Sequence, residues 1–211
     1  MTRLVLASQS PSRRLLLRNA GIEPEIRVSH VDEEALEAAM PGVTPGELCL
    51  ALAKAKAEAV SPHYADDPDI VVVACDSVFD VDGQAFSKAE SEDQVRERWA
   101  LMMGRSGVLR TGHWVVRIAT GQEVGAVCDT VVHLGSPTRQ EQDAYLATGE
   151  PLQVAGGFTI DALGGAFVNG IEGDPSNVVG LSLPTLRDLL AQVGIVWTDL
   201  WNQSSSIVRP S

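Results

Sequence analysis

The sequence predicts an α/β fold built on one mixed β-sheet, with helices on both faces. In the first half of the chain, apolar runs typical of strands alternate with stretches of helical periodicity. Later apolar runs flank short turns, as antiparallel hairpins do. Between these two patterns, Ile70 to Cys75 reads IVVVAC, a continuous apolar run typical of a central strand buried on both faces. Alternating strands and helices predict parallel strand pairs, and hairpins predict antiparallel ones. We therefore expect a mixed sheet.

Two strands and three helices are expected before residue 60. Ser10 is a good N-cap and Pro11 suits the first position of a helix. Asp32 and Thr44 can cap two further helices. The expected elements are a strand over 3–7, a helix from Pro11 that ends before Gly21, a strand over 25–29, a short helix from Glu33 and a longer helix over 44–59.

The rest of the chain is expected to form hairpins and three more helices. The strand that begins at Ile70 is expected to end on Asp76, and Asp82-Gly83 is a strong hairpin signal within 78–86. The remaining elements are a helix over 91–103, an antiparallel pair over 109–119 and 123–134, helices over 138–148 and 183–193, and a loop-rich segment over 149–180. We expect a single domain over 1–196 and a loosely attached tail over 197–211.

Composition excludes several classes of function. The 211 residues carry a formal net charge of -12, which disfavours polymeric nucleic acid and anionic membrane surfaces as partners. No apolar run reaches the roughly 18 residues of a transmembrane helix. Three widely spaced cysteines form neither a disulfide framework nor a CxxC metal site, so a cytoplasmic location is expected. Five of the 16 basic residues nevertheless fall within the first 27 positions, which indicates a local anion site.

The turn that contains Ser8, Ser10 and Arg13 is the first candidate site. A strand, a serine-rich turn and a helix N-terminus together present free backbone N–H groups and the positive end of the helix dipole. Arginine adds paired donors that suit phosphate oxygens. An ordinary capped helix with solvated arginines remains the alternative.

Asp76 and Glu33 are the candidate carboxylates. Asp76 follows a buried strand, where open α/β sheets bind ligands and where a carboxylate can act as general base. Glu33 lies in a second acidic patch, and two carboxylates that meet across a cleft would bind Mg²⁺ with retained waters. The alternatives are a turn cap for Asp76 and a solvated helix start for Glu33.

Three lysines are candidates for a cationic wall. Lys54 and Lys56 are two positions apart on one helix, so at most one of them faces a cleft. Lys88 follows the hairpin and can reach a phosphate from the opposite side. Solvent exposure is the alternative for each lysine. Cys75 is expected to face the core.

Other common chemistries find no support in the sequence. The four histidines show no metal-ligand spacing and no pairing with a nucleophile. The chain also lacks a GxGxxG motif after a strand and a GxxxxGK[ST] motif, so dinucleotide-binding and P-loop interpretations fail.

The assembled motifs resemble the Maf family of nucleoside triphosphate pyrophosphatases over about Leu4 to Ile195. The resemblance is carried by eight fragments in the expected order: LVLASQSPSRRLLL, VSHVDE, LALAKAKAEAV, VVACDSVFDVDGQ, SKAE, MMGRSGVLRTG, YLATGEPLQVAGGF and GDPSNVVGLSLP.

This resemblance implies a fold like that of inosine triphosphatases, elongated and with two lobes around a central cleft. It implies hydrolysis of a nucleoside triphosphate to the monophosphate and pyrophosphate with Mg²⁺ or Mn²⁺, in a house-cleaning role. Asp76 would accept the proton of the attacking water, and Glu33 and Asp76 would help to hold the metal. The triphosphate would be bound by basic and hydroxyl side chains: Arg13, Lys56, Lys88, Ser8 and Ser10.

The chain also departs from the family pattern. Ser12 stands where an arginine is frequent, Val154 and Asp161 replace a lysine and a glutamine associated with base discrimination, and of a GKP pattern only Lys88 remains. Asp161 is thus a candidate for contact with the base, which is left open among pyrimidine, modified and 7-methylguanine nucleotides. Analogy also suggests a homodimer.

Two rival functions remain from the sequence. One is a nucleotide-binding regulator of cell division with little catalysis, which the changes at Ser12 and Asp161 would support. The other is a sugar-nucleotide or phosphatase-type enzyme, which would release sugar phosphate or orthophosphate.

Overall fold

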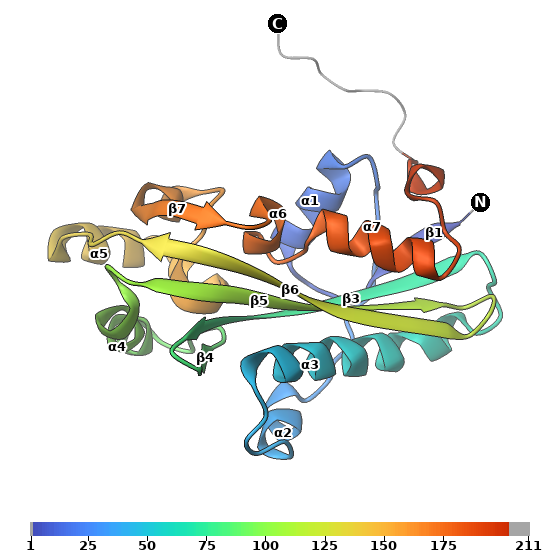
Figure 1. The fold of residues 1–211 in the computed structure, drawn as a ribbon, viewed down its shortest axis with the longest axis horizontal. Helices are drawn as coiled ribbons and strands as arrows, with labels where there is room; N and C mark the ends of the chain where they lie inside the picture. Colours follow the sequence, from blue (N-terminus) through green and yellow to red (C-terminus); the bar gives the residue numbers. More distant parts are fainter. Residues whose placement is uncertain (1, 203–211) are drawn as a thin grey trace, which may run out of the picture.

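The computed structural model describes residues 2–202, which form a seven-stranded mixed sheet (Figure 1). Its order is β2-β1-β3-β5-β6-β7, and β4 pairs with β3. β1 is parallel to β2 and β3, whereas all other pairs are antiparallel. The strands are β1 (Arg3–Leu6), β2 (Glu25–Ile26), β3 (Ile70–Val81), β4 (Gln84–Phe86), β5 (Ser106–Arg117), β6 (Gln122–Leu134) and β7 (Val168–Glu172). The predicted mixed α/β fold is therefore confirmed.

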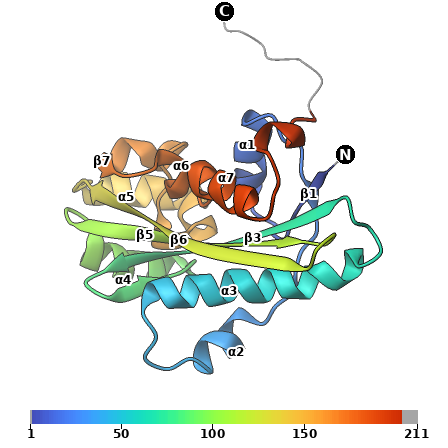
Figure 2. The ribbon, with the colours of Figure 1, turned by 45° about the vertical axis from the view of Figure 1, so that its right-hand side comes forward.

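Helices cover both faces of the sheet (Figures 1 and 2). One face carries α1 (Pro11–Asn19), α6 (Pro175–Val178) and α7 (Leu183–Gln192), and the opposite face carries α2 (Glu33–Ala38) and α3 (Pro45–Val60). Helices α4 (Glu92–Met102) and α5 (Arg139–Leu146) lie toward the end of the sheet where β7 is found. Short 3₁₀ segments complete the fold: η1 (Ser61–Tyr64), η2 (Glu150–Gln153), η3 (Ala155–Gly157), η4 (Leu163–Phe167) and η5 (Trp197–Leu200).

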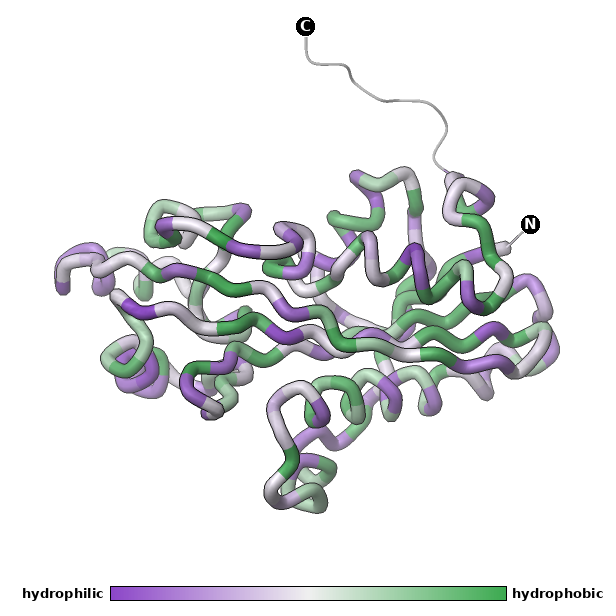
Figure 3. The backbone as a smooth tube through the Cα atoms, in the orientation of Figure 1, coloured by the Kyte–Doolittle hydropathy of each residue, from purple (hydrophilic) through white to green (hydrophobic). Residues whose placement is uncertain are grey.

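Three clusters of buried side chains form the core. The first lies between α1, α7 and the sheet, and the second lies under α3 on the other face. The third, around Phe79 and Trp99, lies toward α4 and α5. Figure 3 shows long hydrophobic stretches along the strands at the β1 end, where both faces are covered. Within residues 2–202, no helix has the length and apolarity that crossing a membrane requires.

Helix α3 is held unusually close to the sheet. Thr44 and Glu47 form a capping box at its start, and Pro45 occupies the first turn. Gly112 of β5 lies directly beneath the helix, and a Cβ atom there would be 2.3 Å from the carbonyl oxygen of Cys49. Only glycine permits this approach, which brings the side chains of α3 down onto β3.

The edge of β3 that faces β1 contains a notch. β1 pairs with Ile70–Val73, and β4 pairs with Phe79–Val81. Between them, residues 74–78 have no strand neighbour on this side within the described chain. The prediction that the strand ends at Asp76 is wrong, because β3 continues to Val81 through its antiparallel pairing with β5. The strand that ends near this point is β1, whose last residue, Leu6, pairs with Val73. Because β3 extends beyond the end of β1, part of its edge is left without a neighbour, and this part is the notch.

The chain after Val196 contacts the body as far as it is described. Leu200 is buried, and the ring of Trp201 lies over Gly21. Asn202 accepts a hydrogen bond from Glu23 N at 2.7 Å through Oδ1 and donates one to Glu23 O through Nδ2. The tail predicted to be loosely attached from residue 197 thus includes six residues with defined contacts, and its remainder, 203–211, lies outside the described residues.

Candidate functional site

Asp76 and Lys56 form a buried ion pair in the notch of β3. Lys56 Nζ lies 2.5 Å from Asp76 Oδ1, and the side chains are 9% and 11% exposed. The close approach of α3 to the sheet directs Lys56 inward. Lys54 lies on the half-exposed side of the helix, where its ammonium is 3.7 Å from Glu58 and 5.1 Å from the ring centre of Trp114. The prediction that at most one of the two lysines faces inward is confirmed.

Glu33 extends this pair to a group of three charges. Asp32 caps α2 by accepting a hydrogen bond from Ala35 N at 2.9 Å, and this places Glu33 in the first turn. Glu33 Oε1 lies 2.9 Å from Lys56 Nζ, whereas its side chain is 54% exposed. Lys56 therefore links a buried carboxylate to a solvent-facing one. The two acidic residues singled out from the sequence are brought together through a single ammonium group.

Arg13 reaches the notch from the opposite face of the sheet. Its guanidinium donates to Cys75 O at 2.8 Å through Nη1, and Cys75 is one of the residues without a β1 or β4 neighbour. The same group donates to Gly180 O at 2.7 Å and Ser77 Oγ at 3.0 Å. The side chain of Arg13 is thus fixed by backbone and hydroxyl acceptors from three segments of the chain.

Ser8 and Ser10 shape the turn between β1 and α1. Ser8 Oγ accepts hydrogen bonds from Arg13 Nη1 and from Ser10 N, both at 3.2 Å. Ser10 Oγ accepts from Arg13 N at 3.4 Å as the predicted N-cap of α1. Both serines line a pocket of about 240 Å³, together with Gln9, Pro11, Arg14 and Ile26. The turn and the helix cap expected of an anion turn are therefore present, and they border a cavity.

Lys88 follows β4, the strand that bounds the notch at the end away from β1. It is exposed and lies two residues beyond Phe86. Partial burial of the ammonium lowers its pKa, and the positive charge of Arg13 lowers it further. Glu33 and Asp76 act in the opposite direction. The charges that influence the pKa of Lys88 are thus those of the other candidate residues.

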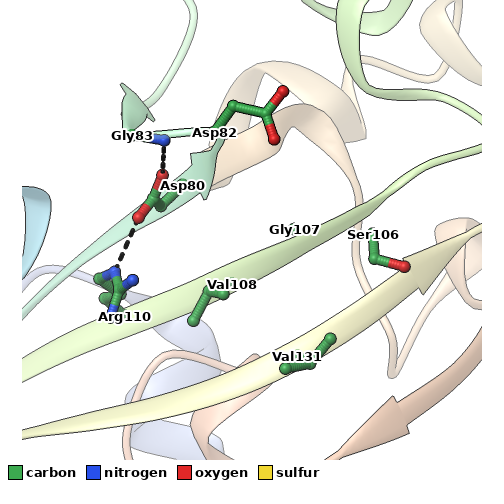
Figure 4. Close-up of a pocket in the computed structure, with 8 residues that line it drawn as sticks. All are labelled: Asp80, Asp82, Gly83, Ser106, Gly107, Val108, Arg110 and Val131. Atoms are coloured by element: carbon green, nitrogen blue, oxygen red, sulfur yellow. Dashed lines mark hydrogen bonds and ion pairs between the residues drawn. The ribbon is translucent and has the colours of Figure 1, made fainter.

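A second pocket lies further along β3 and contains none of the predicted site residues. It has a volume of about 280 Å³ and lies between β3, β5 and β6 (Figure 4). On its wall, Asp80 accepts hydrogen bonds from Arg110 Nε at 2.9 Å and Gly83 N at 2.8 Å. Arg110 also pairs with Asp129. Of the other polar side chains drawn in Figure 4, Asp82 pairs with Arg105 and Ser106 bonds to His133, two residues that do not line the pocket. Each polar side chain of the lining thus has a partner within the protein.

Asp161 does not join the group in the notch. It is exposed, and none of the hydrogen bonds and ion pairs described above involves it. Sequence reasoning also missed three contributors to the geometry: Ser77, Gly180 and the carbonyl of Cys75. Ser77 could have been noticed as the hydroxyl next to Asp76. Gly180 and a backbone carbonyl carry no signal in a single sequence.

The donor set limits what kind of metal site is possible. No group of three or more His, Cys, Asp or Glu side chains within residues 2–202 is arranged to hold a metal ion. Glu33 and Asp76 supply two carboxylates, which suits Mg²⁺ that also takes phosphate oxygens and waters as ligands. The residues thus fit a metal that arrives with a polyphosphate and do not form an all-protein cage.

Comparisons with known proteins agree with the motifs. The family model described as Maf-like protein matches residues 3–193. The chain is 51% identical to a protein of Rhodococcus erythropolis named nucleoside triphosphate pyrophosphatase, over 97% of this chain and 99% of the relative. Proteins with the same name from Streptomyces coelicolor (94% of each chain) and Nocardia farcinica (94% and 96%) are 52% and 53% identical.

Among solved structures, the crystal structure of a nucleoside-triphosphatase / dITP/XTP pyrophosphatase from Mycobacterium abscessus is 14% identical. It matches with a TM-score of 0.37 over 70% of this chain and 95% of that chain.

Proposed function

The chain belongs to the Maf family, and we propose that it is a nucleoside triphosphate pyrophosphatase, a hydrolase that acts on acid anhydrides. The reaction is nucleoside triphosphate plus water to nucleoside monophosphate plus pyrophosphate. The observation that carries the proposal is the meeting of two groups at the notch of β3. One is the carboxylate pair bridged by Lys56, and the other is the anion turn around Arg13.

Asp76 is the general base of the proposed mechanism. Its carboxylate takes a proton from water while the water oxygen bonds to the α-phosphorus. The bond from that phosphorus to the bridging oxygen breaks, and pyrophosphate leaves with the bond's electron pair. Arg13, Lys56 and Lys88 bind the triphosphate and offset the negative charge that moves onto the leaving group. Phosphoryl transfer needs mainly positioning and charge stabilisation, so these residues suffice without a covalent nucleophile.

Glu33 and Asp76 are the residues that would hold a divalent cation, Mg²⁺ or Mn²⁺. Bound there, the ion would neutralise phosphate oxygens and orient the chain of phosphates. The exposure of Glu33 leaves one side of this position open to solvent, through which a metal–nucleotide complex can enter.

We place this activity in the cytoplasm, in a house-cleaning role on the nucleotide pool. A single domain over residues 1–196 would carry it, without polymeric nucleic acid or membrane as partner. We further propose that Asp161, on the exposed segment after Thr159, contributes to selection of the base among pyrimidine, modified and 7-methylguanine nucleotides. By analogy with the family we also propose a homodimer, which sedimentation of the purified protein tests.

A nucleotide panel tests the proposal directly. Purified protein with Mg²⁺ or Mn²⁺ should release monophosphate and pyrophosphate from at least one nucleoside triphosphate, and Asp76→Asn should abolish this while the far-UV circular dichroism is retained. Orthophosphate or sugar phosphate as the product would contradict the assigned bond. Tight binding of a nucleotide without turnover would favour a nucleotide-binding regulator instead, and an Asp76→Asn variant with wild-type turnover would refute the role of Asp76.

A further inference from the structure

Arg13 belongs to a ring of hydrogen bonds that the proposed mechanism leaves unused. From the guanidinium the ring runs to Ser77 Oγ at 3.0 Å, and from there to Thr111 Oγ1 at 2.9 Å. The imidazole of His113 continues the path. Its Nδ1 lies 3.0 Å from Thr111 O, and its Nε2 lies 2.8 Å from Ser182 N. Gly180, two residues before Ser182, closes the ring by accepting from Arg13 Nε at 2.7 Å. Thr111, His113 and Ser182 are at most 1% exposed.

The bonding of His113 defines its protonation. Ser182 N–H can only donate, so Nε2 of the ring is the acceptor and carries no proton. Nδ1 then carries the single proton and donates to Thr111 O. Burial lowers the pKa of His113 to about 4, and the charge of Arg13 acts in the same direction. The imidazole is therefore a neutral side chain with both nitrogens occupied.

His113 is one of the groups that position the loop between α6 and α7. Asn177 O also accepts a hydrogen bond from Gly180 N at 2.8 Å, and Ser176 Oγ accepts one from Leu183 N at 2.9 Å. Gly180 has a φ of +106°, and a Cβ atom there would meet Arg13 Nε at 3.3 Å, so the backbone lies against the guanidinium. Ser182 is the N-cap of α7 and fixes the end of the loop. Because His113 holds Ser182 N, two residues after Gly180, it contributes to the direction in which the Gly180 carbonyl points. Buried networks of this kind lose much of their value when one member is removed.

We propose that His113 is a positioning residue for the anion turn: through Ser182 and Gly180 it holds the Arg13 guanidinium in the orientation that binds phosphate. The inference rests on the proposed function. His113 touches no substrate in this scheme, and its effect on binding passes through Arg13. Loss of the imidazole should weaken the binding of the triphosphate in the ground state and in the transition state alike, and should therefore raise KM more than it lowers kcat.

The test uses inorganic tripolyphosphate with Mg²⁺, because this ion carries the three phosphates without a base. His113→Phe removes both hydrogen bonds of the ring. His113→Gln offers a side-chain carbonyl to Ser182 N–H, whereas His113→Asn is too short to reach it. Leu190→Ala in α7 is the matched control, because the side chain of Leu190 is fully buried in the core cluster between α1, α7 and the sheet and forms no hydrogen bond. Affinity is measured by titration calorimetry, and KM and kcat with the best nucleotide of the panel.

His113→Phe and His113→Asn are expected to weaken tripolyphosphate binding about tenfold, as one lost hydrogen bond to a charged network would. His113→Gln should recover most of the affinity, and Leu190→Ala should keep it despite a lower melting temperature. If His113→Phe does not fold, the difference in tripolyphosphate affinity between His113→Asn and His113→Gln provides the same test. If all His113 variants bind tripolyphosphate as the wild type does, or if Leu190→Ala loses as much affinity as His113→Phe, the role of His113 is refuted. The proposed function is not affected by either result. A wild-type protein that neither binds tripolyphosphate nor releases pyrophosphate would overturn the proposed function with it.

Discussion

The ammonium of Lys56 lies 2.5 Å from the carboxylate of Asp76, and this contact joins helix α3 to the middle of strand β3. Both side chains are about nine-tenths buried. A charge in such a place is costly unless it is paired, so the two residues depend on one another for folding as well as for chemistry. The pair therefore couples the stability of the sheet edge to the integrity of the candidate site.

Lys56→Met should destabilise the protein by about 3 kcal/mol, because it leaves the Asp76 carboxylate buried and unpaired. Turnover should be lost as well. Urea unfolding followed by circular dichroism measures the first effect, and pyrophosphate release measures the second. Lys54→Met, at an exposed position two residues away, should change the free energy of unfolding by no more than about 0.5 kcal/mol and should retain activity.

The double variant Lys56→Met/Asp76→Leu separates the two roles of the pair. Replacing both charges by apolar side chains removes the unpaired carboxylate, so most of the lost stability should return. Activity should not return, since the general base is gone. A double variant that is as unstable as Lys56→Met would show that the ion pair is not what makes Lys56 important for folding.

Local periodicity predicted much of this arrangement. The 3.6-residue repeat separates Lys54 from Lys56, and the apolar run of β3 placed Cys75 in the core, where it is buried. The end of β3 differs from the prediction because the residues after Asp76 are held by pairing with β5. The sequence predicts a strand over 109–119, but its pairing with β3 leaves no local pattern. The notch depends on where two neighbouring strands stop.

The ring behind Arg13 illustrates what a single sequence cannot show. His113 and Ser182 are 69 positions apart, and their bond joins a strand to the start of a helix. The histidine has no neighbour in the sequence that suggests a role.

The segment over 149–167 is a second example of structure that the sequence does not show. Bonds between side chains and the backbone hold it together, and such bonds leave no periodicity. Its expected loop character conceals an ordered structure of three 3₁₀ segments.

Arg13→Lys should weaken the binding of tripolyphosphate by roughly 100-fold, although the positive charge is kept. The guanidinium donates to Gly180 O, Cys75 O and the two hydroxyls of Ser8 and Ser77 at once. An ammonium group has no planar fork and cannot reproduce these directions. Titration calorimetry measures the change. Arg18→Lys, on the exposed side of the same helix, is the control and should bind as the wild type does; equal binding by both variants would mean that charge alone suffices at position 13.

Glu150→Gln should loosen the segment that carries Asp161. The carboxylate accepts hydrogen bonds from Tyr145 Oη at 2.8 Å and Thr159 Oγ1 at 2.5 Å, and from Gly164 N at 3.1 Å. In glutamine an NH₂ group replaces one of the two oxygens. This group cannot accept the hydrogen bonds that the carboxylate accepts, and we expect the loss to lower the free energy of unfolding by about 1–2 kcal/mol. Because Asp161 lies between Thr159 and Gly164, we expect the ratios of kcat/KM between nucleotides to change.

The nucleotide panel applied to Glu150→Gln measures those ratios, and chemical unfolding measures the stability. Asp188→Asn, at an exposed site on α7, is the control that removes a carboxylate without touching this segment. A Glu150→Gln variant that loses stability but keeps every ratio of kcat/KM would show that the segment does not take part in base selection.

His113 should make the stability of the protein depend on pH. Burial lowers the pKa of His113 to about 4 in the folded state, whereas an unfolded chain has a value of about 6.5. The folded state thus favours the neutral ring. Stability from this group is fully present above about pH 6.5, and it falls as the pH decreases toward 4, by roughly 3 kcal/mol in total.

Urea unfolding of the wild type and of His113→Gln between pH 7 and 4.5 tests this dependence. Carboxylates titrate in both proteins, so the difference between the two curves isolates His113. Below about pH 6 the wild type should lose up to about 1.4 kcal/mol more per pH unit than the variant, which is the value for one proton. Parallel curves would mean that His113 does not take up a proton on unfolding, and the neutral, doubly hydrogen-bonded ring described above would then be incorrect.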